Sequence, residues 1–262
     1  MWTREELTHV VELAREFGVR IISDEIHSDL VLPSSGKKHV PLACVARSLG
    51  YEHMVMTMSG PGKTWNVAGC HSGFVVMESS AMRKRYMDVV GHAYLSYGSI
   101  FATTTMLAAY ANVVEVQEEQ QQQEEERGNV GSAPDADAGA VLRQNLTDPA
   151  KWLDDVLKYL DRNIDLVERF VAERLPRIRV MRPEASFLVW LDCRAMGTTG
   201  EQLELFFTNK AKVFLSSGSG FGGKHASGFM RMNVACPRSF LVEALDRIAR
   251  AYDNAFPAGK CL

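Results

Sequence analysis

Three side chains in this sequence stand where they could act together on a small charged molecule. Asp24 follows a short apolar run in IISDEIHSDL, Lys63 follows another in MTMSGPGKTWNVAG, and Arg231 lies within GFMRMNVAC. Taken singly, each has an ordinary explanation: a capping acid, a lysine after a tight turn, and a strand arginine paired with a carboxylate of the protein. The Gly-Pro-Gly turn before Lys63 could also cradle an anion through its N–H groups, although its spacing is not that of a Walker loop.

Together, an acid, a lysine and an arginine are the groups that amino-acid chemistry on pyridoxal 5'-phosphate (PLP) requires. The amine of Lys63 would form a Schiff base with the cofactor aldehyde. Asp24 would keep the pyridine nitrogen protonated, so that the ring withdraws electrons. Arg231 would hold the substrate α-carboxylate through a bidentate contact and so select which bond at Cα breaks.

The first part of the chain predicts helices that alternate with buried strands. Thr3 and Glu6 form a capping box at the start of a helix, and Gly18 can end it. The short apolar runs that follow do not alternate with polar residues, which is typical of strands buried on both faces of a mostly parallel sheet. The predicted strands are 19–22, 54–58 and 74–77, and the predicted later helices are 79–90 and 101–115.

Residues 116–140, VQEEQQQQEEERGNVGSAPDADAGA, differ in composition from the rest of the chain. A Glu/Gln-rich stretch followed by Gly, Ala, Asp and Pro has almost no apolar surface to bury, which predicts a disordered or loosely helical acidic insertion. We therefore expect three parts. Residues 1–115 are the remainder of a large α/β domain, 116–140 are the insertion, and 141–262 are a smaller α+β domain.

The C-terminal part predicts a long helix followed by alternating strands and helices. Asp148 and Pro149 are a good cap and first-turn pair for the long helix. In the last predicted strand, a period of two places Arg231 on one face with Phe229 and Asn233, opposite the face of Met230 and Met232. The predicted later elements are strands near 186–192, 212–216 and 229–235 and helices near 200–210 and 238–252.

Composition and charge exclude several classes of protein. The chain has 262 residues, of which 46% are hydrophobic and 23% charged, as in ordinary globular proteins. No apolar run approaches the ~18 residues of a membrane span, and the start MWTREEL does not read as a signal peptide. A net charge of −3 offers no basic surplus for nucleic acid. Five widely spaced cysteines without CxxC, and histidines without metal spacing, argue against disulfides and metal and for a reducing, cytoplasmic location.

The order of these features resembles the class I/II aminotransferase family of fold-type I PLP enzymes. The segments WTREELTHVVELAREFGVRIISDEIHSDLVL, GKTWNVAGCHSGFVV, PEASFLVWLDCRAMG and GFMRMNVACPRSFLVEALDRI carry the resemblance, and only 116–140 is foreign to it. Within the family the chain looks most like the cystathionine β-lyase (cysteine-S-conjugate β-lyase) branch, because DEIH places His27 where many relatives have a tyrosine.

The resemblance implies a role for each matching residue. Lys63 is the Schiff-base lysine and, once the substrate amine displaces it, the general base that takes the Cα proton. Asp24 faces the pyridine nitrogen and His27 lies near the ring hydroxyl. Arg231 binds the substrate carboxylate, and Ser59 contacts the cofactor phosphate. The resemblance also implies that the complete protein is a homodimer with its active site near the interface.

The sequence departs from the family pattern in two places. Gly60 and Gly62 stand where many relatives have phosphate-binding serines, and His71 stands where many have an arginine. The family also has a segment before WTREEL, with a glycine-rich phosphate loop, that has no counterpart here. We therefore expect a partial large domain, whose sheet exposes edges and apolar faces.

Three functions stay open at this point. The first is a β-lyase that converts L-cystathionine or related cysteine S-conjugates to a thiol, pyruvate and ammonia. The second is an aminotransferase that passes the amino group of an amino acid to a 2-oxo acid. The third is a truncated, inactive relative. The first two share Asp24, Lys63 and Arg231, so the sequence barely separates them.

Overall fold

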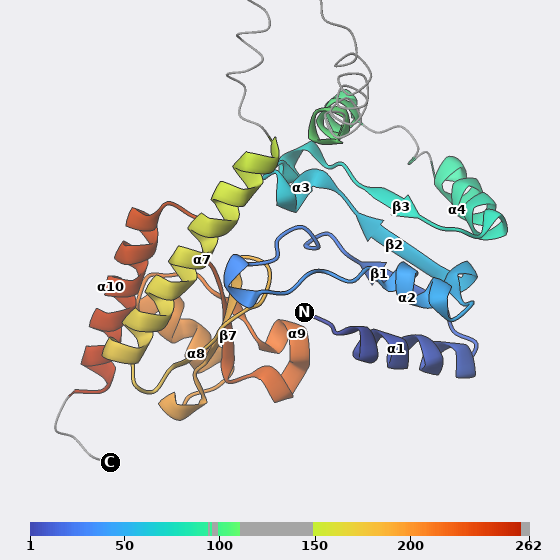
Figure 1. The fold of residues 1–262 in the computed structure, drawn as a ribbon. Coiled ribbons are helices and arrows are strands. Elements are labelled where there is room, and N and C mark those ends of the chain that lie inside the picture. Colours follow the sequence, from blue (N-terminus) through green and yellow to red (C-terminus); the bar gives the residue numbers. More distant parts are fainter. Residues whose placement is uncertain (94, 96–98, 111–148, 258–262) are drawn as a thin grey trace, which may run out of the picture. The chain divides into compact units, whose positions relative to one another are not determined.

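The computed structural model describes most of the chain outside the acidic segment (Figure 1). The predicted insertion at 116–140 and the predicted cap Asp148 lie outside the described residues. The described residues are 1–93, 95, 99–110 and 149–257.

The chain divides into two compact units. The first unit comprises Met1–Asp29 and Lys38–Asp154, and the second comprises Leu30–Lys37 and Asp155–Leu262. The chain therefore leaves the first unit after Asp29, belongs to the second unit over Leu30–Lys37, and returns to the first unit at Lys38.

The first unit contains a three-stranded sheet with helices, in the predicted order and with strand limits that differ from the prediction by one or two residues. Residues 100–110 are also helical. The other elements are α1 (Arg4–Glu16), β1 (Ile21–Asp24), α2 (Leu42–Ser48), η2 (Glu52–Met54), β2 (Val55–Ser59), α3 (Pro61–Thr64), η3 (Ala68–Cys70), β3 (Phe74–Val76) and α4 (Ser80–His92).

The predicted capping box at the start of α1 is confirmed. The Thr3 hydroxyl accepts a hydrogen bond from the Glu6 N–H at 3.2 Å, and the Glu6 carboxylate accepts one from the Thr3 N–H at 2.7 Å. This reciprocal pair satisfies two N–H groups that a helix start otherwise leaves unpaired. The buried face of α1 packs against α2 and the strands in a cluster of Leu7, Val11, Ala14, Leu42, Val45, Ala46, Tyr51 and Val55.

The sheet of the first unit has one parallel and one antiparallel pair. Its order is β1-β2-β3, with β1 parallel to β2 and β2 antiparallel to β3. The expectation of strands buried on both faces is wrong for these strands. Ile21 and Val55 pack into the cluster of α1 and α2, whereas Ile22 on the opposite face is 66% exposed. The helices of the described residues cover one face, and the other stays open to solvent.

The second unit is an antiparallel sheet with helices, as predicted for an α+β domain. Its sheet order is β4-β5-β7-β6. Its elements are η1 (Pro33–Ser35), α7 (Pro149–Arg174, in this unit from Asp155), β4 (Arg179–Met181), β5 (Leu188–Asp192), η4 (Arg194–Met196), α8 (Glu201–Leu205), η5 (Phe206–Lys210), β6 (Ser216–Ser217), α9 (Ser219–Gly222), η6 (Gly223–Ala226), β7 (Phe229–Asn233) and α10 (Arg238–Ala255).

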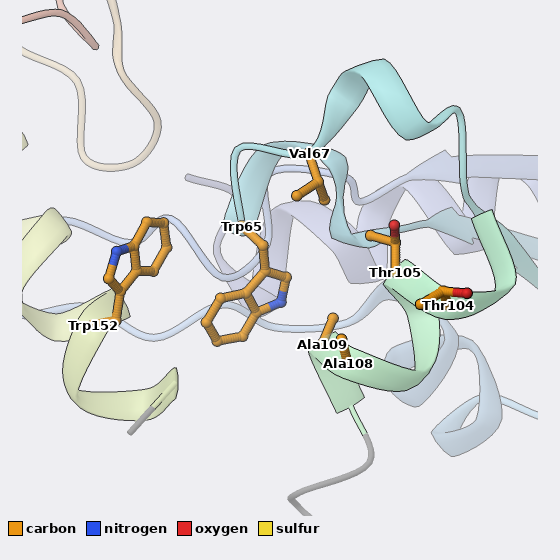
Figure 2. Close-up of a pocket in the computed structure, with 7 residues that line it drawn as sticks. All are labelled: Trp65, Val67, Thr104, Thr105, Ala108, Ala109 and Trp152. Carbon is orange, nitrogen blue, oxygen red and sulfur yellow. The ribbon is translucent and has the colours of Figure 1, made fainter. Parts of the chain in front are cut away.

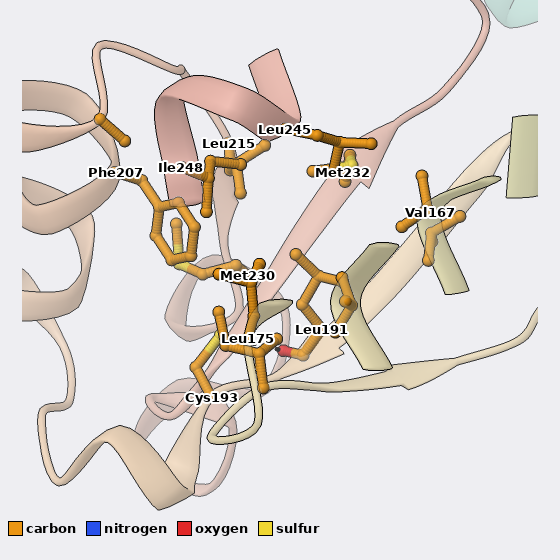
Figure 3. Close-up of a cluster of buried hydrophobic side chains, with 14 of the residues drawn as sticks. Val167, Leu175, Leu191, Cys193, Phe207, Leu215, Met230, Met232, Leu245 and Ile248 are labelled. Carbon is orange, nitrogen blue, oxygen red and sulfur yellow. Dashed lines mark hydrogen bonds between the residues drawn. The ribbon is translucent and has the colours of Figure 1, made fainter. Parts of the chain in front are cut away.

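One face of this sheet carries the hydrophobic core of the second unit (Figure 3). Burial alternates along β5 and β7, so that every second side chain points into the core. Val189 and Leu191 of β5 and Met230 and Met232 of β7 pack there with side chains of α7 and α10. The opposite, less buried face is the one that carries Arg231, as the period of two predicts.

The predicted strand near 212–216 is wrong. The Val213 N–H bonds back to the Phe207 carbonyl at 2.9 Å, and Lys212 has a left-handed backbone with φ +57°. Lys212 and Val213 therefore follow the end of the helical stretch formed by α8 and η5, and they do not form a strand. Pairing with β7 begins only at Ser216, and β6 is two residues long.

The segment Leu30–Lys37 is bound into the second unit by backbone and side-chain contacts. Val31 forms a β-bridge with Ala185, and the Leu32 N–H donates to the Glu184 carbonyl at 3.0 Å. The Ser34 backbone N–H and hydroxyl both donate to the Asp161 carboxylate, at 2.9 and 2.7 Å. These contacts make the segment an integral part of the second unit.

Candidate functional site

Two neighbouring strands of the first unit run parallel and end at the same edge of the sheet. β1 ends at Asp24 and β2 ends at Ser59, and the register pairs Asp24 with Met58. The next residue, Glu25, donates its backbone N–H to the Met58 carbonyl at 2.8 Å. Ligands of open α/β sheets bind at the carboxyl ends of parallel strands. The loops after Asp24 and Ser59 therefore meet where a ligand is expected.

Asp24 presents an exposed carboxylate at this edge. Its Oδ1 accepts a hydrogen bond from the Ile26 N–H at 3.2 Å. Among the described residues, Oδ2 has no hydrogen-bond or ion-pair partner. One carboxylate oxygen is thus available to a cationic or N–H group of a ligand.

The neighbouring acid Glu25 is buried and fully engaged inside the first unit. Its carboxylate accepts hydrogen bonds from the Ser23 hydroxyl at 2.9 Å and the Leu42 N–H at 3.1 Å, and pairs with His39 Nε2 at 2.8 Å. These contacts satisfy the buried charge and cap the start of α2. Of the two adjacent acids, only Asp24 is free to meet a ligand.

Lys63 lies in the one-turn helix α3, directly after the end of β2. It is half-buried, and its amine has no hydrogen bond or ion pair with a described residue. A side chain at Gly60 would come within 2.8 Å of the Ser72 carbonyl, and one at Gly62 within 3.3 Å of Ala68 Cα. A Cβ is thus excluded at Gly60 and crowded at Gly62, so both glycines allow close packing of the chain on itself, and this packing shapes the turn that carries Lys63.

Two further predicted residues lie in the same loops. The Ser59 hydroxyl donates to the Glu25 carbonyl at 3.4 Å, a weak contact that a better acceptor can replace. His27 is half-buried in the turn after β1.

A fifth polar side chain of this region was not anticipated from the pattern of residues. The Ser72 hydroxyl is buried and has no partner within the described part of the chain. Its backbone lies against Gly60, in the loop that leads into β3. The only sequence feature that could have pointed to Ser72 as a site residue is its position next to His71, where many relatives have an arginine.

Arg231 lies on β7 in the second unit, directly opposite Trp190 of β5. Its guanidinium stacks on the ring of Phe221, with Cζ 4.2 Å from the ring centroid. Nη2 donates to the Ser216 hydroxyl at 3.3 Å, and Nε is buried without a partner among the described residues. An arginine with stacked faces and unused in-plane donors is suited to a planar carboxylate.

The structure thus brings four of the five predicted residues to one edge of one sheet. Asp24 and Ser59 are the last residues of β1 and β2, and His27 and Lys63 lie in the turns that follow these strands. Arg231 belongs to the second unit and is described within it.

A pocket of about 370 Å³ lies in the first unit (Figure 2). The rings of Trp65 and Trp152 stack with centroids 5.7 Å apart, and Figure 2 shows both of them at the pocket with small side chains of the helix at 100–110. The lining residues are Trp65, Val67, Thr104, Thr105, Ala108, Ala109 and Trp152. None of the five predicted residues lines it, and we do not assign it to the candidate site.

Other site types find no support in the described residues. Within 1–93, 95, 99–110 and 149–257, no cluster of His, Cys, Asp and Glu could hold a metal ion. The four cysteines in that part of the chain, Cys44, Cys70, Cys193 and Cys236, are all free thiols. None of the helices described there is long and apolar enough to cross a membrane.

Comparison with known proteins finds curated relatives that match nearly the whole of this chain. A curated relative, cystathionine β-lyase PatB of Bacillus subtilis, is 30% identical over 250 residues, which cover 95% of this chain and 54% of the relative. Protein MalY of Escherichia coli is 27% identical over 252 residues, covering 96% of this chain and 53% of the relative. The chain therefore spans about half the length of the curated relatives it matches.

Solved structures and a family model agree with this placement. A PLP-bound putative aminotransferase from Clostridium difficile superposes with a TM-score of 0.77 at 32% identity, covering 96% of this chain and 55% of that one. Cystalysin of Treponema denticola, which contains PLP, superposes with a TM-score of 0.73 over 97% of this chain and 54% of its own; its 24% identity shows the fold alone. The family model of aminotransferase class I and II matches residues 1–133. The chain belongs to the class I and II aminotransferase family.

Proposed function

We propose that this chain contributes the lysine, the acid and the carboxylate-binding arginine of a PLP-dependent carbon–sulfur β-lyase. The substrate would be L-cystathionine or a related cysteine S-conjugate, and the products a thiol, pyruvate and ammonia. The observation that carries the proposal is the placement of Asp24 and Lys63 at the carboxyl ends of two adjacent parallel strands, each with a polar group that has no partner among the described residues. The 30% identity to a cystathionine β-lyase supports this reaction.

The polar groups at this sheet edge fit PLP. The amine of Lys63 has no competing partner among the described residues and can bond the cofactor aldehyde. The free oxygen of Asp24 can accept a hydrogen bond from the pyridine N–H, and the hydroxyls of Ser59 and Ser72 can donate to a phosphate. His27 is proposed to lie near the ring hydroxyl. When bound, PLP supplies an electron-poor ring that stabilises negative charge at the substrate Cα.

The side chains of this chain would then divide the remaining work. Arg231 holds the substrate α-carboxylate through its in-plane N–H donors. Lys63 Nζ, displaced by the substrate amine, removes the proton from Cα as general base. Loss of the thiolate from Cβ follows, and addition of water leads to pyruvate and ammonia. Lys63 Nζ can return its proton to the departing sulfur, which balances the proton transfer.

The whole enzyme is proposed to share the architecture of its family. Residues 1–115 would belong to a mostly parallel PLP-binding domain, which also includes a segment found in the longer relatives. Residues 116–140 would be an insertion, and 141–262 would be the smaller domain. We also propose a homodimer. Light scattering tests this: a fully active monomer would contradict it.

A second candidate function is transamination. It is favoured by the 32% identity to a PLP-bound putative aminotransferase. Lys63 would again remove the proton from Cα, PLP when bound would carry the amino group, and a 2-oxo acid would accept it. Product analysis separates the two functions, because a lyase releases thiol and pyruvate without an added oxo acid, whereas an aminotransferase depends on one.

The first test is cofactor attachment to Lys63. We expect purified protein to acquire a visible absorbance band with PLP, and borohydride to fix the cofactor on the peptide that contains Lys63. Lys63→Ala should lose both, whereas Lys84→Ala should retain them, because Lys84 is an exposed lysine paired with Asp88 on α4. A wild-type protein without the band would contradict the proposed cofactor role and support the inactive relative.

A further inference from the structure

A strong side-chain contact holds the turn that carries Lys63 to the β1 loop. The Thr64 hydroxyl donates to Asp29 Oδ2 at 2.8 Å, and Thr64 is only 2% exposed. A hydrogen bond to a carboxylate is about twice as strong as a neutral one. A further side-chain contact between these loops, from the Ser59 hydroxyl to the Glu25 carbonyl, is long at 3.4 Å.

The turn itself needs such a tether. α3 comprises four residues, and a single helical turn does not persist without tertiary contacts. Its backbone bonds run to its own continuation, with the Trp65 N–H on the Pro61 carbonyl at 2.9 Å and the Val67 N–H on the Gly62 carbonyl at 3.1 Å. These bonds shape the turn, but they do not fix it relative to the strand end that carries Asp24.

Asp29 is placed to provide that fixed point. It is five residues from Asp24 and is the last residue of the first unit before the chain enters the second. The next residue, Leu30, is 1% exposed, and its carbonyl accepts the Ser186 N–H at 2.7 Å in the second unit. Within the first unit, the Asp29 carboxylate projects from the loop that continues β1, and this loop begins with the Glu25 N–H bonded to the Met58 carbonyl of β2 at 2.8 Å.

Asp29 has few other contacts. The Ser28 hydroxyl donates to Oδ1 at 3.4 Å, a weak interaction. Burial, and secondarily the negative charge of Asp29, raises the pKa of the nearby Tyr110 phenol. The main hydrogen-bonding role of this carboxylate is thus toward Thr64.

We propose that Asp29 and Thr64 are positioning residues for Lys63: their hydrogen bond holds the lysine turn at the sheet edge where Asp24 also ends. The inference rests on the proposed function, because it gives the pair a role toward the bound cofactor. Neither residue touches the reacting atoms. Breaking the bond lets the turn move, so that Lys63 Nζ samples positions away from the cofactor aldehyde.

Conservative and disruptive variants separate this role from general stability. Thr64→Ser and Asp29→Asn keep a donor and an acceptor, whereas Thr64→Val and Asp29→Ala remove them. Thr57→Val is the matched control, since the buried Thr57 hydroxyl on β2 has no partner among the described residues. It makes the same chemical change in the same unit without breaking a hydrogen bond.

Two readouts are needed, one of them independent of the cofactor. In the protein without PLP, we expect backbone amide exchange in 62–67 to be about tenfold faster in Thr64→Val and Asp29→Ala, as loss of one charge-assisted hydrogen bond predicts. With PLP, the same two variants should bind the cofactor about tenfold more weakly, as the visible absorbance band measures. Thr64→Ser and Thr57→Val should stay within about threefold of wild type, and Asp29→Asn, which keeps an acceptor but loses the charge, should lie between wild type and Asp29→Ala.

The outcomes distinguish this inference from the proposed function. If wild type binds PLP and Thr64→Val and Asp29→Ala match it in both readouts, the positioning role is overturned while the function stands. The role is also overturned if Thr57→Val shows the same losses, because the effect is then general destabilisation. If wild type takes up no PLP, the proposed function fails, and the role toward the cofactor fails with it.

Discussion

The guanidinium of Arg231 lies over the ring of Phe221, with Cζ 4.2 Å from the ring centroid. Phe221 in turn meets Trp190 edge to face, with centroids 5.6 Å apart. Stacking occupies a face of the guanidinium and leaves its edges, so the ring dictates the plane in which the N–H donors point. A carboxylate that binds both donors must lie in that same plane.

Phe221→Ala should therefore weaken binding of substrates through their carboxylate. Phe221 is 56% exposed, and a cation–π contact at an exposed ring contributes about 0.5–1 kcal/mol, which corresponds to a KM about two- to fivefold higher. The effect on kcat should be smaller, because Phe221 orients Arg231 and does not touch the reacting bond. Steady-state kinetics with the product assay described above measures both constants.

Phe240→Ala is the matched control for this prediction. Phe240 is a 65% exposed phenylalanine of the same unit, on α10, and no stacking contact involves it among the described residues. Its removal should leave KM unchanged. Equal KM values for Phe221→Ala and wild type would show that the stacking does not orient Arg231.

Arg182 is the centre of the ionic contacts that hold the segment Leu30–Lys37 in the second unit. One of its terminal nitrogens pairs with Asp165 and Glu168 of α7, and the other pairs with Asp161 and contacts the Ser34 hydroxyl. Asp161 also accepts both Ser34 hydrogen bonds. The Asp161 side chain is only 13% exposed, so it depends on this cation.

Arg182→Met should lower the free energy of unfolding by about 2–3 kcal/mol, because it leaves a largely buried carboxylate without its partner and partial exposure reduces the full cost. Arg174→Met should cost less than about 1 kcal/mol, since its pair with Asp253 is exposed. Urea unfolding of both variants measures the difference. Equal losses would contradict a special role for Arg182.

Local features of this fold could be predicted from the sequence, because neighbouring residues determine them. The Thr3–Glu6 capping box and the alternation that places Arg231 opposite the core are of this kind. The first strand begins two residues later than predicted, because the Val19 N–H bonds to the Ala14 carbonyl and Gly18 turns the chain with φ +62°. The apolar character of Val19 suggests a strand, but the end of the helix uses its backbone.

Contacts between distant residues could not be predicted in this way. Ser34 and Asp161 are 127 positions apart. No feature of the sequence at 30–37 assigns these residues to a different unit from the residues that precede them. That Asp24 Oδ2 has no partner among the described residues is likewise a consequence of the fold. DEIH contains two adjacent acids, and only the three donors around Glu25 show which one is occupied.

Asn163 is a further distant contact with a measurable consequence. Its fully buried amide donates to the carbonyls of Val234 and Cys236 at 3.0 and 3.2 Å, and its oxygen accepts from Arg238 Nε at 3.2 Å. Asn163→Leu should cost about 2–3 kcal/mol of unfolding free energy, because it leaves these groups unpaired. Asn233→Ala, which removes one exposed local hydrogen bond, should cost less than about 1 kcal/mol. Thermal unfolding compares the two, and equal costs would contradict the prediction.

Cys193 should be the least reactive of the four described thiols. It is fully buried in the core of the second unit, whereas Cys44 is exposed. Burial, with a smaller contribution from the charge of Asp192, raises the pKa of the Cys193 thiol from 9.0 to about 12. Because the thiolate is the reactive form, iodoacetamide at pH 8 should label Cys44 in the native protein and reach Cys193 only after unfolding. Labelling of native Cys193 at the rate of Cys44 would contradict its placement in the core.

The same shift gives the stability of the second unit a pH dependence of known sign. The folded state favours the protonated thiol of Cys193, so the stabilisation is complete below the ordinary pKa of 9.0 and is lost as the pH rises from there toward about 12. Between pH 8 and pH 10.5, wild type should therefore lose more unfolding free energy than Cys193→Ala, in which this group cannot ionise. Urea titrations of both proteins at the two pH values test this. The comparison cancels the titration of all other groups, so equal losses would mean that the Cys193 thiol ionises as readily in the folded protein as in the unfolded one.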